Sequence, residues 1–266
     1  MCRLKSCLVL KDRVYCPDYD HHQDMLDKLG IKDDYLGASK TFVRVELLPP
    51  DGVRSLMEPL DKWTLKVDQD VTPEWWDEAA DRPRVEKAVE AWRRGHVFTE
   101  GEHSVQTGIV YALGGATVTA CDSATVEACG SATVTAYDSA TVTACDSAIV
   151  KAFDSAMVKA HNSARVKAFD SAMVTAYGSA TVKACDSAMV KACGSATVEA
   201  WGSAIVKAHN SARVKAFDSA TVTACDSATV TACDSARVEA CDSATVIYPQ
   251  KNKIVYPAGW TAETHD

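Results

Sequence analysis

The segment Asp138-Ser-Ala-Thr-Val-Thr-Ala-Cys145 is one copy of an octapeptide that occurs seventeen times, without insertion or deletion, between Ala116 and Val246. Every eighth residue from Val118 to Val246 is valine, and alanine stands two positions before each valine. Eight residues are too few for one unit of a helical solenoid, but they suffice for one strand and one turn. The repeat therefore predicts a stack of short strands, in which repetition builds a surface rather than a catalytic pocket.

The octapeptide alternates between an invariant and a variable set of positions. Ala140, Val142 and Ala144 alternate with Thr141 and Thr143, which is the period of a half-buried strand. Other copies place Lys, Glu, Arg or Met at the variable positions, so these must face outward and the Ala-Val-Ala set inward. The Asp/Gly/Asn-Ser pair that follows each strand predicts a corner, because these residues favour left-handed or turn conformations.

Variation between copies indicates how many strands make one coil. Met157, Met173 and Met189 are spaced sixteen residues apart and are followed by Ile205. Alternate repeats also carry most of the aromatic residues that precede a corner: Tyr137, Phe153, Phe169, Trp201 and Phe217. A period of two repeats predicts two-strand coils of sixteen residues. We expect about eight coils, each rising ~4.8 Å.

Composition divides the chain into three parts. Residues 1–103 form a small α+β head domain, residues 104–248 the octapeptide-repeat β-solenoid, and residues 249–266 a C-terminal cap or tail. In the head, the pattern predicts strands over 6–15, 41–48 and 63–67, a helix over 20–29, a helix start at Thr72-Pro73, and a second helix from Asp81 to Arg94. The predicted fold class is mainly β: a β-solenoid preceded by a small α+β domain.

Charge and hydropathy restrict the partners. The formal net charge is −8, and residues 114–246 hold ten Lys/Arg against thirteen Asp/Glu, without the concentrated basic face that nucleic-acid binding requires. No segment approaches the ~18 apolar residues of a membrane span, and the N-terminal apolar run is too short for a signal sequence. We therefore expect no nucleic acid, no membrane, a cytoplasmic location and reduced thiols for the eleven cysteines.

Two resemblances accompany these patterns. The stretch Trp63-Thr-Leu-Lys-Val-Asp-Gln-Asp-Val-Thr-Pro-Glu-Trp-Trp76, with Leu10–Asp20 and a following repeat array, resembles uncharacterised proteins of phages, prophages and gut bacteria, which implies no established activity. The octapeptide is also similar to the repeat of bacterial ice-nucleation proteins, with the corner residue, Ser and aromatic in matching places at Tyr137-Asp138-Ser139. That resemblance implies sixteen-residue coils and, as a function, the ordering of water by regularly spaced threonines.

Several groupings of polar residues have two interpretations. The Asp column (Asp122, Asp138, Asp154, Asp170, Asp186, Asp218 and Asp234) fits turn capping better than calcium binding, because Gly and Asn replace Asp there. Cys193, His209, Cys225 and Cys241 share one column, but a straight column cannot wrap four ligands around zinc, so we expect no metal.

The recurrence of His161-Asn-Ser-Ala-Arg165 at His209–Arg213 is explained by internal duplication. In the head, Asp18, Asp20, His21, His22 and Asp24 resemble a ligand set, although a solvated helix N-terminus explains the acids better.

The sequence favours a non-enzymatic scaffold that presents repetitive faces to a protein partner or to itself, without a cofactor. The interface candidates are Met157, Met173, Met189 and Ile205, since four outward apolar residues should not align on a solvated surface. Two alternatives remain: an ice-nucleation-like function, and an enzyme acting on polysaccharide. The second requires paired carboxylates, whereas the outward Glu127, Glu199 and Glu239 are several coils apart.

Overall fold

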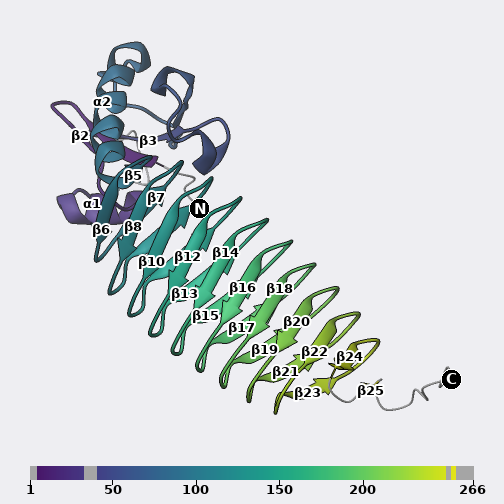
Figure 1. Cartoon of the computed structure of the whole chain (residues 1–266). Coiled ribbons are helices and arrows are strands. Elements are labelled where there is room, and N and C mark those ends of the chain that lie inside the picture. The colour runs from purple at the N-terminus through teal and green to yellow at the C-terminus, as the bar shows by residue number, and fades with distance from the viewer. Residues whose placement is uncertain (1–4, 33–40, 250–252, 256–266) are drawn as a thin grey trace. The chain divides into compact units, whose positions relative to one another are not determined.

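The computed structural model describes residues 5–32, 41–249 and 253–255. The chain divides into two compact units, Met1–Val97 and Phe98–Asp266, each with a core of its own (Figure 1). As predicted, the protein is mainly β, with a solenoid of about nine sixteen-residue turns preceded by a small α+β unit.

The first unit is built on an antiparallel sheet of four strands in the order β2-β1-β3-β4. Its elements are β1 (Lys5–Leu10), β2 (Val14–Tyr15), α1 (His22–Leu29), β3 (Phe42–Leu48), two 3-10 turns (Gly52–Ser55 and Leu60–Lys62), β4 (Thr64–Val67) and α2 (Glu78–His96). Leu8, Met25, Leu26 and Phe42 form a buried cluster between α1 and the sheet. Helix α1 ends at Gly30, whose φ of 66° is the left-handed conformation of a helix C-cap.

The two helices depart from prediction at their N-termini. No helix starts at Thr72: Trp76 N–H instead donates to Pro73 O in a turn, and α2 begins at Glu78, after Asp77. The Asp77 carboxylate accepts N–H bonds from both Ala79 and Ala80, which a threonine at position 72 cannot match. The predicted second helix is therefore the body of one helix, which continues through Pro83 to His96.

Helix α1 starts two residues later than predicted because Asp20 is used elsewhere. Its carboxylate lies 2.8 Å from the Lys5 ammonium and accepts the Ser6 N–H at 3.2 Å. Lys5 is 1 % exposed, and its ammonium also lies 4.9 Å from the Trp92 ring centroid. A buried lysine requires such a counter-charge, so Asp20 serves the sheet rather than the helix.

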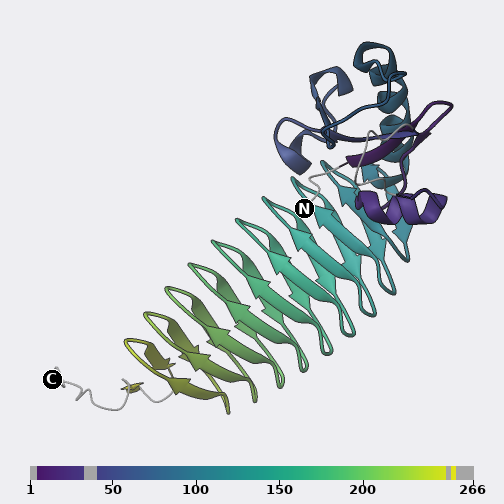
Figure 2. The same cartoon turned by 180° about the vertical axis from the view of Figure 1, so that it is seen from behind.

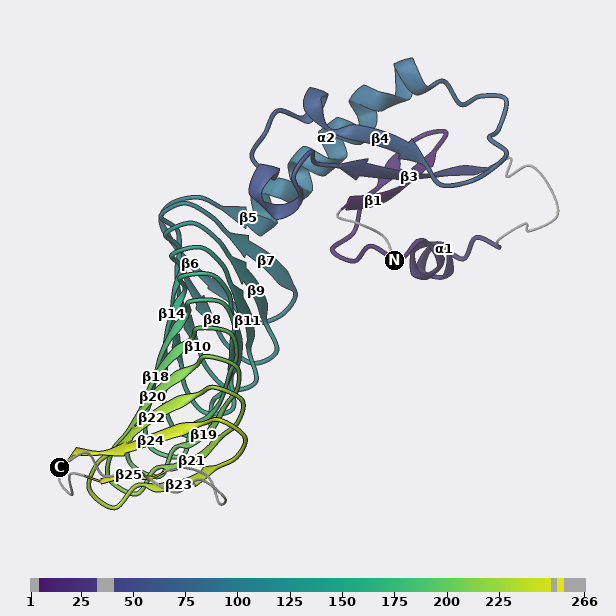
Figure 3. The same cartoon turned by 90° about the vertical axis from the view of Figure 1, so that its right-hand side faces the viewer.

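In the second unit, odd- and even-numbered strands form the two walls of a flattened coil, which Figure 3 shows in a view partly along the stack. The odd wall contains β5 (Val97–Phe98), β7 (Ile109–Ala112), β9 (Thr125–Ala128), β11 (Thr141–Ala144), β13 (Met157–Ala160), β15 (Met173–Ala176), β17 (Met189–Ala192), β19 (Ile205–Ala208), β21 (Thr221–Ala224) and β23 (Arg237–Ala240). The even wall contains β6 (Glu102–Val105), β8 (Thr117–Ala120), β10 (Thr133–Ala136), β12 (Ile149–Ala152), β14 (Arg165–Ala168), β16 (Thr181–Ala184), β18 (Thr197–Ala200), β20 (Arg213–Ala216), β22 (Thr229–Ala232), β24 (Thr245–Tyr248) and β25 (Lys253–Val255).

Strands β7 to β23 of the odd wall and β8 to β24 of the even wall pair in parallel, with like positions facing each other sixteen residues apart, as Val150 faces Val166. The solenoid exceeds the expected eight coils because β5, β6 and β7 precede the octapeptide array.

The inward Ala-Val-Ala set fills the space between the walls. In β14, for example, Val166 is 2 % exposed and Ala168 is fully buried, while Arg165 and Lys167 face solvent. Small side chains let the walls approach closely, and backbone pairing between coils supplies the long-range order.

The corners adopt the predicted left-handed conformation. The non-glycine corner residues have φ between 49° and 58°, where Asp and Asn are tolerated better than other residues with a side chain. At Gly202 (φ 68°), a Cβ would lie 3.2 Å from the backbone N and O of Asp186, so a side chain there requires the neighbouring coil to shift slightly. Figure 2 shows these turns along the edges of the stack.

Candidate functional site

The four predicted interface residues stand in one column of the odd wall. Met157 faces Met173, Met173 faces Met189, and Met189 faces Ile205 in the parallel register of β13 to β19. Their exposed fractions are 43 %, 40 %, 43 % and 45 %. Because neighbouring strands are ~4.8 Å apart, these side chains form a continuous apolar stripe, which we call the Met/Ile row.

Polar residues surround the Met/Ile row. Thr141 and Thr221 occupy the same column directly before and after it. Two positions further along the strands, a second outward column holds Lys159, Thr175, Lys191 and Lys207. The long lysine stems can extend the apolar surface while their ammonium groups remain in water.

The predicted aromatic column lies at the corner that leads from the even wall into the odd wall. Successive rings stack, with centroids 5.1 Å apart for Tyr137–Phe153 and 4.9 Å for Phe153–Phe169. Cys185 interrupts the column, which resumes with Trp201 and Phe217 at 4.0 Å. These separations follow the strand spacing, so the rings reinforce the stacking of coils.

The Asp column serves the corners. In each of several coils, the aspartate carboxylate accepts the N–H of the corner residue one coil earlier, as in Asp122 N–H to Asp138 Oδ2 at 3.3 Å. Gly202 N–H donates in the same way to Asp218 at 3.0 Å. The predicted turn capping is therefore present, and it acts between coils rather than within one turn.

The Cys/His column brings three potential metal ligands together. Among the described residues, ligand atoms of Cys225, Cys241 and Asp242 lie within 4.8 Å of one another. A hydrogen bond with Cys225 raises the pKa of Cys241 to about 11, and burial raises the pKa of Cys129 to about 12. Burial and the hydrogen bond between the two cysteines thus disfavour the thiolate form in the absence of a metal ion.

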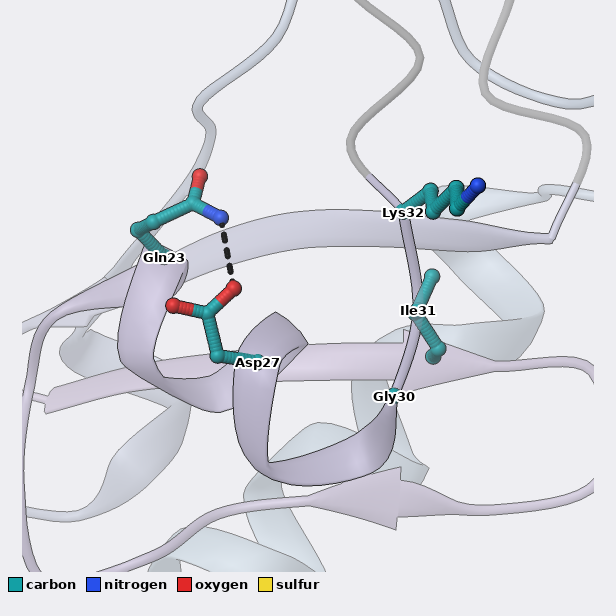
Figure 4. A pocket seen from close by; sticks show the side chains of 5 residues that line it. All are labelled: Gln23, Asp27, Gly30, Ile31 and Lys32. Atoms are coloured by element: carbon teal, nitrogen blue, oxygen red, sulfur yellow. Dashed lines mark hydrogen bonds between the residues drawn. The ribbon is translucent and has the colours of Figure 1, made fainter.

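The ligand set considered in the head is distributed over separate pairs. Asp20 binds Lys5, Asp18 lies 3.1 Å from His96, and the buried His22 lies 3.3 Å from both Asp68 and the Val45 carbonyl. A shallow pocket at the end of α1 is lined by Gln23, Asp27, Gly30, Ile31 and Lys32, in which Gln23 donates to Asp27 at 3.0 Å (Figure 4). The polar side chains of this ligand set, and Gln23 with Asp27, therefore take part in hydrogen bonds and charge pairs that stabilise the unit.

The sequence pattern places Lys151, Arg165, Lys167, Lys183 and Arg213 on one face, where they interrupt the threonine columns; in the structure they belong to a basic surface on the even wall. We call it the cation ladder; it consists of Lys151, Arg165, Lys167, Lys183, Arg213 and Lys215. Each of the six side chains is exposed, and within the described part of the chain none of them forms an ion pair within 4.0 Å. Lys215 completes this set, and sorting the outward residues by their sixteen-residue register separates the cations from the acidic corners.

The outward carboxylates do not form a catalytic pair. Glu127 and Glu239 lie near opposite ends of the odd wall, in β9 and β23, while Glu199 stands on the even wall, in β18.

Neither of the two helices in the described residues has the length and apolar composition needed to cross a membrane. No protein-family model, curated protein or solved structure matches the chain.

Proposed function

We propose that this chain is a non-enzymatic β-solenoid scaffold that binds a protein partner, or a second copy of itself, through the Met/Ile row. The observation that carries the proposal is the alignment of four large apolar side chains, each at least 40 % exposed, in one register column. From β9 to β23, all outward positions of the odd wall outside the Met/Ile row hold Thr, Lys, Glu or Arg. Between β9 and β23 the apolar character is thus confined to one stripe, and the exposed Ile109 of β7 is separated from it by Thr125 and Thr141.

Strand formation does not explain the methionines. Thr125, Thr141 and Thr221 occupy the same column within strands of the same length and register, so threonine satisfies the fold there. Burying the exposed part of each apolar side chain contributes on the order of 1 kcal/mol. Four adjacent residues on a fixed backbone therefore supply a binding surface at little conformational cost, and methionine adapts to varied partners.

The test replaces Met157, Met173 and Met189 by threonine, the residue that flanks them in the column. We expect the wild-type protein to self-associate or to retain a protein partner, and the triple variant to lose that interaction. Sedimentation equilibrium measures self-association, and cross-linking with mass spectrometry in the native cell locates a partner on the odd wall. The matched control is Ile149→Thr, which removes a comparably exposed apolar residue (38 %) from the even wall.

The triple variant should retain the β circular dichroism and the thermal midpoint of the wild type, since its substitutions copy neighbouring coils. If association persists unchanged in the triple variant, or if Ile149→Thr weakens it equally, the Met/Ile row is not the interface. A wild-type protein that stays monomeric and forms no cross-link on the odd wall contradicts the proposal as a whole.

A further inference from the structure

A duplicated segment supplies four of the six residues of the cation ladder. Residues 161–168 and 209–216 share the sequence His-Asn-Ser-Ala-Arg-Val-Lys-Ala, and each places an arginine and a lysine outward on the even wall. The two Arg/Lys pairs lie in β14 and β20, three coils apart. Lys183 in β16 stands between them, 5.3 Å from the Trp201 ring centroid, and Lys151 in β12 extends the ladder beyond the first pair.

Like charges in the ladder face each other directly. Lys151 pairs in register with Lys167, and Lys167 with Lys183, in neighbouring parallel strands. Like charges in such positions destabilise a sheet, and a separation of ~4.8 Å is shorter than the Debye length of ~8 Å at physiological salt. Threonine fills the same column at Thr135 and Thr231, so the fold does not require the lysines. A bound polyanion would relieve this repulsion.

The two edges of the even wall differ in charge. The corner that leads into β12 is Asp146, whereas those that lead into β14, β16, β18 and β20 are the uncharged Asn162, Gly178, Gly194 and Asn210. The opposite corners, which follow β12, β14, β16 and β20, are Asp154, Asp170, Asp186 and Asp218. A four-residue strand spans only ~13 Å, so a ligand must be narrow to contact the cations and avoid the aspartates.

We propose that the even wall binds an extended acidic polysaccharide with one carboxylate on each sugar, which runs along the stack from β12 to β20. Arg165 and Arg213 can each bind a carboxylate through two parallel N–H···O hydrogen bonds. The lysines supply single positive charges to the other carboxylates of the chain. Thr181 and Thr197 stand between the two arginines in the same outward column and offer hydroxyl groups to the sugar rings.

Glu199 favours a glycan over a nucleic acid. It stands within the lysine column, between Lys183 and Lys215. The sugar–phosphate backbone of DNA has no hydroxyl group that could donate a hydrogen bond to Glu199, so the carboxylate would meet only phosphate charge there. A uronic-acid chain has hydroxyl groups between successive carboxylates, and one of these can donate a hydrogen bond to Glu199. From β12 to β20, the outward strand positions of this wall hold no aromatic residue on which unpaired bases could stack.

The first experiment measures binding of a polygalacturonate oligosaccharide to the full chain by calorimetry, with dextran of similar length as the neutral comparison. We expect polygalacturonate to bind, more weakly as salt rises, and dextran not to bind. The double variant Arg165→Gln/Arg213→Gln should lose at least about tenfold in affinity, because each arginine makes charge-assisted bonds. The control Arg237→Gln removes an exposed arginine from the equivalent strand position on the odd wall and should leave affinity unchanged.

The thermal midpoint provides a second measurement, which is made first without ligand and then with it. In the absence of ligand, Lys167→Thr should raise the thermal midpoint, because it removes repulsion with two neighbours. Polygalacturonate should stabilise the wild type more than this variant. The Met157→Thr/Met173→Thr/Met189→Thr variant should bind polygalacturonate as the wild type does, which separates this proposal from that on the odd wall.

Three outcomes would overturn the proposal: no binding of polygalacturonate, equal loss in the double variant and Arg237→Gln, or a Lys167→Thr variant that is less stable than wild type. Binding of oligodeoxythymidylate at least as tight as that of polygalacturonate, with the same dependence on Arg165 and Arg213, would instead identify the even wall as a nucleic-acid surface and would also overturn it.

Discussion

At the scale of single residues, the corners determine whether neighbouring coils can stack in register. Each corner combines a left-handed residue with hydrogen bonds to the coil before it. For example, Ser155 N–H donates to the Asp138 carbonyl at 3.0 Å, and Asp138 N–H faces the Asp154 carboxylate at 3.4 Å. Asp and Asn can meet both demands, whereas a Gly corner adopts the conformation and keeps the backbone bond, as in Ser203 N–H to the Asp186 carbonyl, but lacks the side-chain acceptor. The exchange of these three residues along the column thus reflects conformation more than charge.

The corner mechanism makes a prediction at Asp154, which has a φ of 54°. Asp154→Ala should lower the free energy of unfolding by about 1–2 kcal/mol, because alanine is strained in this conformation and cannot accept the hydrogen bond. Asp154→Asn should lie close to the wild type, since Asn162 adopts a φ of 56° in an equivalent corner. Urea unfolding followed by circular dichroism measures all three proteins. Equal stability of the alanine and asparagine variants would contradict the conformational explanation.

At the scale of the strand, the core has one large position and two small ones. Val182 is fully buried in the middle of the array, whereas Val238 in β23, the last strand of the odd wall, is only partly buried. In repeat proteins each unit is stabilised by its immediate neighbours. A substitution in a central coil therefore affects two interfaces between coils, and one in the last coil affects fewer.

This difference predicts the outcome of a pair of valine substitutions. Val182→Ala should destabilise the solenoid by about 2 kcal/mol, since it removes buried methyl groups and leaves a cavity between walls that cannot close. Val238→Ala is the matched control and should cost less than half as much. Hydrogen exchange would show whether protection falls on both sides of the altered coil. A larger loss at Val238 than at Val182 would contradict the model of nearest-neighbour stabilisation.

The elements also show which parts of the fold follow from sequence. The sixteen-residue period of Met157, Met173 and Met189 was sufficient to predict the coil, because strand pairing keeps each residue type in one column. Helix α2 was misplaced because Thr72-Pro73 carries the local signal for a helix start, whereas Asp77 forms the actual cap. The buried Lys5–Asp20 pair could not be predicted, since it joins a strand to a loop through tertiary packing.

At the scale of the whole solenoid, two surfaces share one rigid framework. The Met/Ile row belongs to the odd wall and the cation ladder to the even wall, and both occupy the central coils. The outer coils carry mainly threonine at these positions, as at Thr117, Thr119, Thr229 and Thr231. The threonine coils therefore extend the array, and variation in the middle coils gives each wall its own chemistry.

The ends of the stack determine whether the solenoid remains a discrete molecule. Strand β25 pairs in antiparallel orientation with β24, with Ile254 facing Ile247, and so covers the C-terminal edge of the even wall. On the odd wall, β23 is the last strand, and Ala236, Val238 and Ala240 are only partly buried there. Parallel strands with unpaired edges recruit further strands, so the antiparallel β25 interrupts a register that another solenoid could otherwise continue.

We therefore expect Ile254→Pro, which removes an N–H and distorts β25, to promote end-to-end association of solenoids. The variant should sediment as species whose size rises with concentration, and it should bind a dye specific for cross-β stacks, while each chain keeps the wild-type circular dichroism. Combining it with Met157→Thr, Met173→Thr and Met189→Thr separates this association from lateral contact, since end-to-end growth does not use the Met/Ile row. If the combined variant returns to the wild-type size, the association is lateral, and β25 does not act as a cap.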